Sequence, residues 1–279
     1  MIICVDLDRT LIYSANALDL GTETPRLLCV EIYQGAPLSY MTETAAQLLR
    51  TLPAHVVPST TRTLEQLARV RLPGPPSRYA IASNGGHLLV DGVPDPAWTA
   101  RVTARLAGCA PLAEVESHLR AAAGPFVLAL KAAGDLFAYA VVDRGALPDG
   151  WVAALAAWCA PRGWAVSLQG RKVYAVPRPL TKSAAALEVR ERLGGGLLLA
   201  AGDSLLDADL LDVADAAIRP PHGELAEAGF TRDHLTVTAT TGVRAGEEVL
   251  AWMHARATAG STTAGTTRRT TPSWRCGTS

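Results

Sequence analysis

The sequence predicts an α/β protein in which a Rossmann-like, doubly wound parallel sheet carries a smaller inserted α+β domain. Ile2–Val5 is short and apolar at every position, which is typical of a strand buried on both faces of a parallel sheet. Further short apolar runs at 55–59, 79–83, 197–200 and 216–218 end in polar turns. Helical patterns separate several of these runs, and strands that alternate with helices indicate a parallel sheet.

Residues 88–178 show a different order of elements, and we expect them to form the inserted domain. Helices and paired strands in such an order can fold as a separate α+β layer. The core domain is then discontinuous and consists of 1–87 and 179–255. The Thr-, Ser-, Gly- and Arg-rich residues 256–279 are expected to form a disordered tail. Within 88–178, the patterns predict helices at 97–106, 112–122 and 150–159 and strands at 126–131, 136–142, 164–168 and 172–176.

The segments that flank the core strands also have recognisable patterns. Residues 15–38 predict a β-hairpin flap followed by a loop, and 41–52 predicts a helix with Thr42 or Ser39 as its cap. Further helices are predicted at 64–70, 183–193 and 246–253, and a closing strand is predicted at 236–239.

Composition excludes several classes of protein. Lys and Arg together number 26, as do Asp and Glu, and a binder of nucleic acid or anionic membranes usually carries a basic excess. No apolar run reaches membrane-spanning length, and the chain opens on Met1 and a strand instead of a secretory signal. The five cysteines form no CxxC pair, which favours free thiols in a reducing cytoplasm. We expect a cytoplasmic monomer or homodimer without nucleic-acid or membrane partners.

Two carboxylates, Asp6 and Asp8, follow the first predicted strand directly. In open α/β sheets the ligand crevice lies beyond the carboxyl ends of the strands, so these acids are placed for chemistry. The alternative is an Asp-rich turn, because Asp often ends strands. Asp203 and Asp207 similarly follow the strand at 197–200.

Two further residues stand at predicted helix starts. Thr60 lies in the turn before the helix at 64–70, where exposed N–H groups and a hydroxyl favour a phosphate, although Thr60 or Thr61 could simply cap that helix. Lys182 opens the helix at 183–193. A lysine there is unfavourable to the helix dipole, so a nearby anion would explain it, and an ordinary surface lysine is the alternative.

Four motifs in one order resemble those of the haloacid dehalogenase (HAD) superfamily of phosphatases. DLDRT at 6–10 resembles the DxDxT motif, VVPSTTR at 56–62 the second motif, LTKSAAAL at 180–187 the lysine motif, and AGDSLLDADLL at 201–211 the acidic motif. SNGG at 83–86 is similar to the SNGA stretch of the Cof-type branch. The position of 88–178 matches that of the C2 cap in this branch, which includes proteins like sucrose-phosphate phosphatase.

The resemblance implies roles for individual residues. Asp6 is expected to be the nucleophile that forms an aspartyl-phosphate, and Asp8 the general acid and base. Thr60 and Lys182 would hold the transferred phosphoryl group. Mg²⁺ would be held by Asp6, the Asp8 main-chain carbonyl and Asp203, with Asp207 as a ligand or a support. A calcium loop fits poorly, because the acids lie at separate strand ends. The expected substrate-binding residues are Arg9, Arg62, Asn84, Gly85, Arg171 and Lys172.

The implied function is a Mg²⁺-dependent phosphatase of a small phosphorylated metabolite, such as a sugar phosphate or a phosphoglycerate glycoside. The alternatives are a mutase like the phosphomannomutases, which share the core and cap, and a non-catalytic metabolite-binding regulatory protein. Arg9 departs from the family, which usually has Gly directly after the acid and base. It could anchor the substrate or narrow the site.

Overall fold

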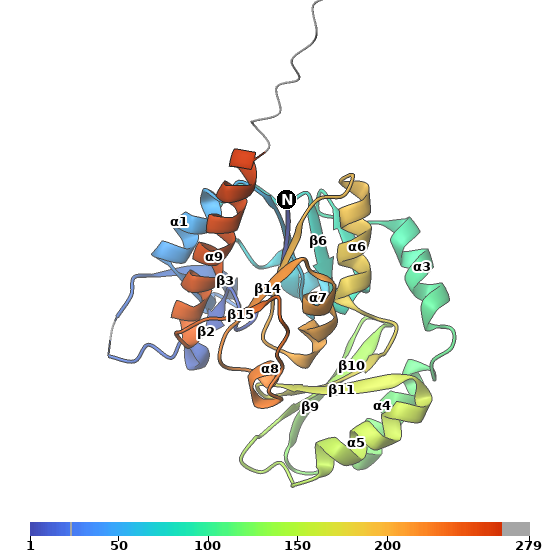
Figure 1. Ribbon diagram of the computed structural model, residues 1–279. Coiled ribbons are helices and arrows are strands. Elements are labelled where there is room, and N and C mark those ends of the chain that lie inside the picture. Colours follow the sequence, from blue (N-terminus) through green and yellow to red (C-terminus); the bar gives the residue numbers. More distant parts are fainter. Residues whose placement is uncertain (23, 264–279) are drawn as a thin grey trace, which may run out of the picture.

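The computed structural model describes residues 1–22 and 24–263. Its core is a five-stranded parallel sheet of order β15-β14-β13-β1-β5 (Figure 1). β1 is central and pairs in register with both neighbours, so Ile2 lies opposite Leu198 on one side and His55 on the other. The predicted α/β fold class is confirmed. The strands are β1 (Ile2–Val5), β5 (His55–Pro58), β13 (Leu198–Ala201), β14 (Ala216–Arg219) and β15 (Leu235–Val237).

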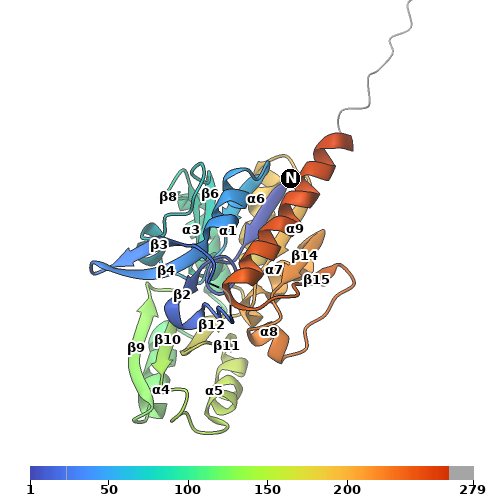
Figure 2. The same cartoon turned by 90° about the vertical axis from the view of Figure 1, so that its left-hand side faces the viewer.

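Helices cover both faces of this sheet, and the alternation of side chains along β1 supplies both apolar layers. Ile3 and Val5 pack in the cluster that includes α1 and α9, whereas Ile2 and Cys4 pack in the cluster that includes α6 and α7. Figures 1 and 2 show these two helix layers on opposite sides of β1. The helices are α1 (Glu43–Arg50), α6 (Lys182–Arg192), α7 (Ala208–Val213) and α9 (Gly242–Thr263).

The predicted flap is a β-hairpin formed by β3 (Leu27–Tyr33) and β4 (Ala36–Thr42), and β4 also pairs with the short β2 (Tyr13–Ser14). β4 occupies residues that we expected to form a loop and the start of a helix. The helix α1 begins only at Glu43, because the Thr42 side chain accepts a hydrogen bond from the Ala45 N–H and caps it. The short α2 (Leu64–Ala68) follows β5.

A second antiparallel sheet lies beside β5. It contains β6 (Tyr79–Ala82), β7 (His87–Val90) and β8 (Val93–Pro94), and an isolated bridge between Ser59, just after β5, and Ile81 of β6 links it to the core sheet. α3 (Pro96–Leu106) packs on this sheet, and its Arg101 forms an ion pair with Glu188 of α6 at 2.6 Å. These contacts attach β7, β8 and α3 to the core.

The four-stranded antiparallel sheet β11-β12-β10-β9 forms a separate layer below the core. Both views show α4 and α5 on the side of this sheet that faces away from the core (Figures 1 and 2). We propose that the cap consists of residues 112–177 and not of the predicted 88–178. Its elements are α4 (Leu112–Ala122), β9 (Val127–Ala133), β10 (Phe137–Val142), α5 (Trp151–Cys159), β11 (Trp164–Gln169) and β12 (Lys172–Pro177).

The prediction of disorder from Arg256 onwards is wrong at its start, because α9 continues to Thr263. Ala257 is buried against the core, and the Arg256 guanidinium lies 3.7 Å from the centre of the Trp252 ring. These contacts favour helix where composition alone indicates disorder. The rest of the predicted tail, 264–279, lies outside the described residues. In the described part of the chain, no helix is long and apolar enough to cross a membrane.

Candidate active site

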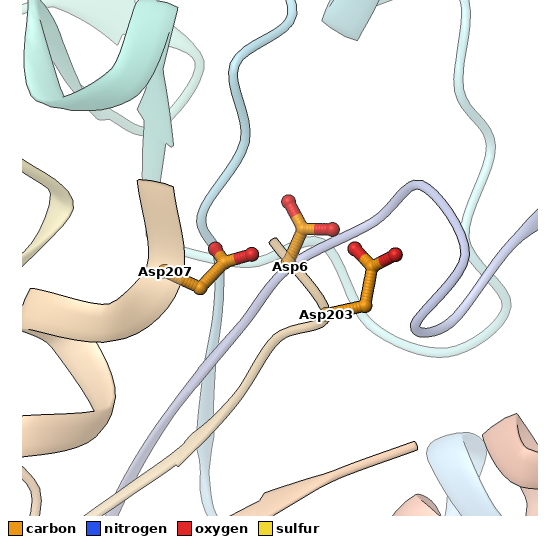
Figure 3. A group of neighbouring side chains, drawn as sticks. All are labelled: Asp6, Asp203 and Asp207. Carbon is orange, nitrogen blue, oxygen red and sulfur yellow. The ribbon is translucent and has the colours of Figure 1, made fainter. Parts of the chain in front are cut away.

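Three aspartates meet at the carboxyl edge of the core sheet (Figure 3). Val5 and Ala201 are paired in register, so the residues after β1 and β13 emerge side by side. Asp6 follows β1 directly, Asp203 follows β13, and Asp207 ends a short 3-10 helix, Leu205–Asp207. One carboxylate oxygen from each lies within 4.8 Å of the other two. The three sequence-predicted acids are therefore brought together.

Lys182 is fully buried beside this cluster. Its Nζ donates hydrogen bonds to Asp6 Oδ1 at 2.7 Å and Asp207 Oδ1 at 2.5 Å. Thr181 fixes the start of α6, because its side chain accepts a hydrogen bond from the Ala184 N–H. Burial disfavours the charged amine, but Asp207 and Asp6 raise the pKa of Lys182 above its ordinary value. Lys182 is thus not a surface lysine, and an ammonium group has a third donor available for a ligand.

The aspartate cluster carries more negative charge than Lys182 offsets. Burial raises the pKa of Asp6 to about 7; Lys182 opposes this shift, whereas Asp207 and Asp8 add to it. Burial, followed by the charges of Asp6 and Asp207, also raises the pKa of Asp203 well above its usual range. Buried carboxylates that repel one another form the donor set that a hard divalent cation prefers. The residues present fit Mg²⁺.

Hydrogen bonding separates the roles of Asp207 and Asp203. Asp207 Oδ1 accepts from Lys182, and its Oδ2 accepts from the N–H and the hydroxyl of Ser204 at 3.0 and 2.7 Å. Both oxygens are therefore engaged, which favours a supporting role for Asp207. Asp203 instead has a looser contact, with its Oδ2 3.5 Å from Arg9 Nε. Gly223 permits this arrangement, since a Cβ there would lie 2.5 Å from Asp203 Oδ2.

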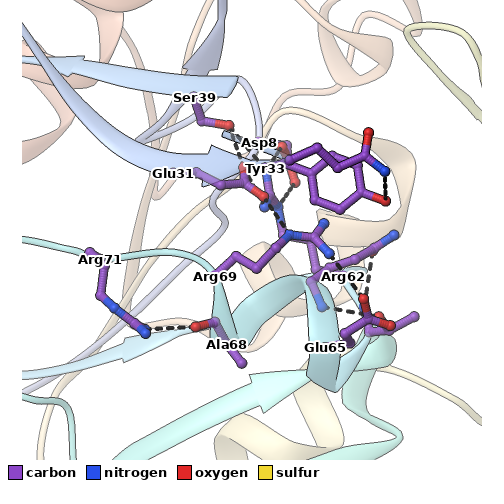
Figure 4. A network of polar contacts seen from close by, with 12 residues as sticks. Asp8, Glu31, Tyr33, Ser39, Arg62, Glu65, Ala68, Arg69 and Arg71 are labelled. Atoms are coloured by element: carbon purple, nitrogen blue, oxygen red, sulfur yellow. Dashed lines mark hydrogen bonds and ion pairs between the residues drawn. The ribbon is translucent and has the colours of Figure 1, made fainter. Parts of the chain in front are cut away.

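The Asp8 side chain points toward Arg62 (Figure 4). Arg62 Nε and Nη2 donate to the two Asp8 oxygens, each at 2.8 Å. Burial alone would raise the pKa of Asp8, but Arg62 holds it below the ordinary value. If Asp8 contributes to a metal site, it therefore does so through its main-chain carbonyl and not through its carboxylate.

Arg62 is also tied to the flap. Its Nη1 lies 2.8 Å from Glu31 Oε2, and Glu31 in turn accepts from the Ser39 hydroxyl at 2.6 Å and pairs with Arg69 at 3.3 Å. We call Asp8, Glu31, Ser39, Arg62 and Arg69 the arginine network (Figure 4). Arg62 was predicted to bind substrate, but its donors are committed to these partners. Its position favours a role in orienting Asp8.

Thr60 is buried two residues after the end of β5. Its hydroxyl oxygen accepts from the Arg62 N–H at 3.1 Å, which leaves the hydroxyl proton free to donate to a phosphate. The alternative role as a helix cap is wrong for Thr60 and Thr61, because Thr63 caps α2 in a capping box with Gln66.

Asn84 and Gly85, also predicted to bind substrate, contact the segment that precedes Lys182. Asn84 Nδ2 donates to the Leu180 carbonyl at 2.8 Å, and a Cβ on Gly85 would lie 2.0 Å from the Thr181 carbonyl oxygen. Both residues therefore support the position of Lys182. The buried Oδ1 of Asn84 has no hydrogen-bond partner among the described residues, so a substrate contact stays a prediction for that atom.

The two predicted cap residues have different surroundings. Lys172 Nζ lies 5.7 Å from the centre of the Tyr139 ring, and the nearby Tyr174 and Asp8 raise the pKa of Lys172 against the effect of burial. Arg171 lines a cavity together with Arg9 and Asp203. Arg171 lies in the turn before β12, whereas Lys172 is the first residue of that strand, and the two side chains have different neighbours. Binding of substrate by these two residues stays a prediction.

Sequence reasoning missed Glu31, Ser39 and Ser204. Glu31 carries a usable signal, because an acid inside an apolar strand such as β3 needs a buried partner. The partner itself, Arg62, lies 31 residues further along the chain, and local patterns do not identify it.

Comparisons with known proteins bear on the fold. Neither the protein-family models nor the curated protein sequences give a match. Among solved structures, the chain is similar to the sucrose-phosphatase from Synechocystis in complex with sucrose and phosphate, with a TM-score of 0.60 and 13% identity over 91% of this chain and 97% of that chain. A HAD subclass IIB sugar phosphatase gives a TM-score of 0.56 and 11% identity over 92% and 99%.

A haloacid dehalogenase-like hydrolase from B. subtilis gives a TM-score of 0.53 and 15% identity over 90% of this chain and 98% of that one. These alignments each include the parallel core and the inserted layer, since they cover at least nine tenths of this chain. The resemblance read from the four motifs is confirmed at the level of the fold. The chain has the fold of the haloacid dehalogenase superfamily phosphatases.

Proposed function

We propose that the protein is a Mg²⁺-dependent phosphatase that hydrolyses a small phosphorylated metabolite through an aspartyl-phosphate. The observation that carries this proposal is the meeting of Asp6, Asp203 and Lys182 at the carboxyl edge of the sheet, with Asp8 two residues from Asp6 in a different charge environment. The similar solved structures include a sucrose-phosphatase and a sugar phosphatase, which supports a sugar phosphate or a related metabolite as substrate.

In the first step, a carboxylate oxygen of Asp6 attacks phosphorus while the bond from phosphorus to the leaving oxygen breaks. Lys182 and Thr60 donate to the phosphoryl oxygens and offset the charge that develops on them. Asp8 gives its proton to the leaving alkoxide. Because Arg62 holds Asp8 ionised, Asp8 must first take up a proton, and the arrival of a dianionic ester favours this by raising its pKa.

In the second step, water attacks phosphorus and the Asp6–phosphorus bond breaks. Asp8, now a carboxylate, takes the proton of that water. Asp6 and Asp203 are the side chains proposed to hold Mg²⁺, with the Asp8 main-chain carbonyl as a further ligand. When bound, the cation would neutralise part of the charge of the carboxylates and of the ester.

A screen of phosphorylated metabolites with detection of inorganic phosphate tests the proposal. We expect phosphate release that depends on Mg²⁺ and disappears in Asp6→Asn. Appearance of a rearranged phosphate ester in place of free phosphate would identify a mutase. Binding of a metabolite without any turnover would indicate a non-catalytic protein.

A further inference from the structure

A polar cavity of about 260 Å³ lies between the core and the cap, next to the aspartate cluster. The cap contributes Arg144 and the turn between β11 and β12, which includes Arg171, and the core contributes Arg9, Asp203 and α8 (Glu224–Glu227). Its volume lies slightly below the roughly 300–1,000 Å³ of sites for drug-sized ligands, so a short and highly polar group fits best.

Three guanidinium groups converge on this cavity from separate segments. Arg171 forms no ion pair or side-chain hydrogen bond within 1–22 and 24–263, and its side chain is exposed. Arg144 uses one nitrogen on the Gly170 carbonyl at 3.1 Å, which holds it over the same turn. The Arg9 contact with Asp203, at 3.5 Å, is longer than a normal hydrogen bond. All three arginines retain donors for a ligand.

The acidic residues of the cavity are less free to balance this charge. Glu224 accepts from the Ser167 hydroxyl at 2.5 Å and from the N–H groups of Leu168 and Leu205 at 2.6 and 3.1 Å, so its carboxylate ties the cap to the core. Asp203 belongs to the proposed cation site, and a bound cation would compete with Arg9 for it. Glu227 is exposed at the rim. The donors that remain available are mainly those of the arginines.

The backbone of Arg9 supplies an independent observation. Its φ is 63°, a left-handed conformation that is unfavourable for a residue other than glycine. The ring nitrogen Nε2 of His222 lies 2.8 Å from the Arg9 carbonyl and holds this conformation. Glycine would adopt this φ without strain. The presence of arginine at this position therefore indicates that its side chain has a function that offsets the strain. Strained residues of this kind concentrate at ligand sites.

We propose that Arg9, Arg144 and Arg171 bind a second anionic group of the substrate. The preferred substrate is then a short phosphate monoester that also carries a carboxylate or a second phosphate, with its transferred phosphate at Asp6 and its other anion in the arginine-lined cavity. This inference rests on the proposed phosphatase function. It assigns a substrate-binding role to Arg144, which sequence patterns did not identify. It gives the same role to Arg171 but not to Lys172.

Matched esters test the inference. 3-Phosphoglycerate and glycerol 3-phosphate differ in a carboxylate against a hydroxymethyl group, and fructose 1,6-bisphosphate and fructose 6-phosphate differ in a second phosphate. Because hydrogen bonds to charged groups are strong, we expect kcat/KM to favour the charged member of at least one pair by about ten- to hundredfold, mainly through KM. The pair that shows the preference distinguishes a carboxylate from a phosphate.

Arg9→Gly and Arg171→Ala should each reduce that preference to within about threefold, and Arg9→Lys should keep part of it. Arg9→Gly also relieves the backbone strain, so its melting temperature should stay near that of the wild type. Arg120→Ala, on the outer helix α4, is the matched control for loss of an exposed arginine and should leave the preference unchanged.

Three outcomes would overturn the inference. Equal hydrolysis of both members of each pair, unaffected by Arg9→Gly, would end it while leaving the phosphatase function intact. An equal loss of kcat/KM for both members of a pair in Arg9→Gly would indicate that Arg9 acts at the transferred phosphate instead. Absence of phosphate release from every ester, including the metabolite screen, would reject the proposed function and the inference with it.

Discussion

The aspartate cluster around Asp6 and the arginine network around Asp8 lie side by side at one edge of the core sheet, and they differ in how buried charge is compensated. The cluster gathers three buried carboxylates, of which Asp6 and Asp207 pair with Lys182 and Asp203 has only a looser contact with Arg9. The network pairs two carboxylates, Asp8 and Glu31, with two guanidinium groups. The pKa of Asp6 is accordingly raised and that of Asp8 lowered.

This difference indicates different roles in stability. A balanced network around the buried Glu31 and Arg62 holds its members in place, and removal of one partner leaves an uncompensated charge. The cluster is compensated in part by Lys182, by the looser Arg9 contact and by proton uptake, and a cation or a substrate supplies the rest. The cluster therefore lowers the stability of the free protein and favours ligand binding, whereas the network raises the stability of the free protein.

Asp6→Asn should have the largest effect, because it removes the proposed nucleophile without changing its size. We expect phosphate release to fall by at least about 10⁴-fold, or ~5.5 kcal/mol in activation free energy. Asp91→Asn, in the exposed turn after β7, is the matched control and should keep full activity. More than about a tenth of wild-type activity in a clean preparation would remove the covalent mechanism, since that loss is only ~1.4 kcal/mol.

Arg62→Met should lower the free energy of unfolding by about 3 kcal/mol, because it leaves the buried Glu31 and the half-exposed Asp8 without their shared partner. Chemical denaturation measures this change. Arg120→Met breaks only an exposed pair with Glu116 and should cost about 0.5 kcal/mol or less. A loss below about 1 kcal/mol in Arg62→Met would show that the network does not stabilise the fold.

Mg²⁺ should act on the cluster and leave the network unchanged. A chelator should abolish phosphate release, and Mg²⁺ at about 100 times its Kd should restore it and stabilise the protein by ~2.7 kcal/mol. Thermal unfolding with and without Mg²⁺ gives the second readout. In Asp203→Asn both effects should weaken together; undiminished stabilisation of this variant would exclude Asp203 as a ligand.

Asp203→Asn should raise the stability of the metal-free protein by about 0.5–2 kcal/mol, because it relieves repulsion within the cluster. Glu31→Gln should have the opposite sign and lower stability by about 1–3 kcal/mol, since it removes a charge that Arg62 and Arg69 share. Both variants replace an acid by its amide, so denaturation in chelator compares them directly. Equal destabilisation by the two would mean that the cluster is as well compensated as the network.

Much of the fold is predictable because its signals are local. The buried strand β1, the helix start at Lys182 and the order of cap elements each follow from the spacing of apolar residues over a few turns. The meeting of Asp6 with Asp203 follows from strand ends in a parallel sheet. The extent of α9 beyond Arg256 is not local, because it depends on burial of Ala257 against a distant layer.

The same distinction applies to the site. Motif positions indicate Asp6, Thr60, Lys182 and Asp203, but they do not show that Arg62 is shared by Asp8 and by Glu31 of the flap. Likewise, Asn84 and Gly85 lie in a recognisable loop, yet their contacts are with a segment almost a hundred residues away. Partner choice across such separations is set by the folded geometry and not by sequence spacing.

The contact between Gly85 and Thr181 favours the exchange of cap domains between proteins of this fold. The chain passes Gly85 before it reaches the cap and Leu180 after it, and these two points touch through the Asn84 amide and the Gly85 backbone. The core therefore holds the two ends of the intervening segment together, in addition to the contacts that this segment makes through Arg101 and Glu224. If another domain replaces the intervening segment, its two ends still have to span the same short distance. Insertion of a whole domain is tolerated when the ends of the inserted segment lie close together. A hybrid that keeps residues 1–111 and 178–263 of this chain, with a foreign cap joined after α3, would retain the contacts of Asn84 and Gly85 that position Lys182.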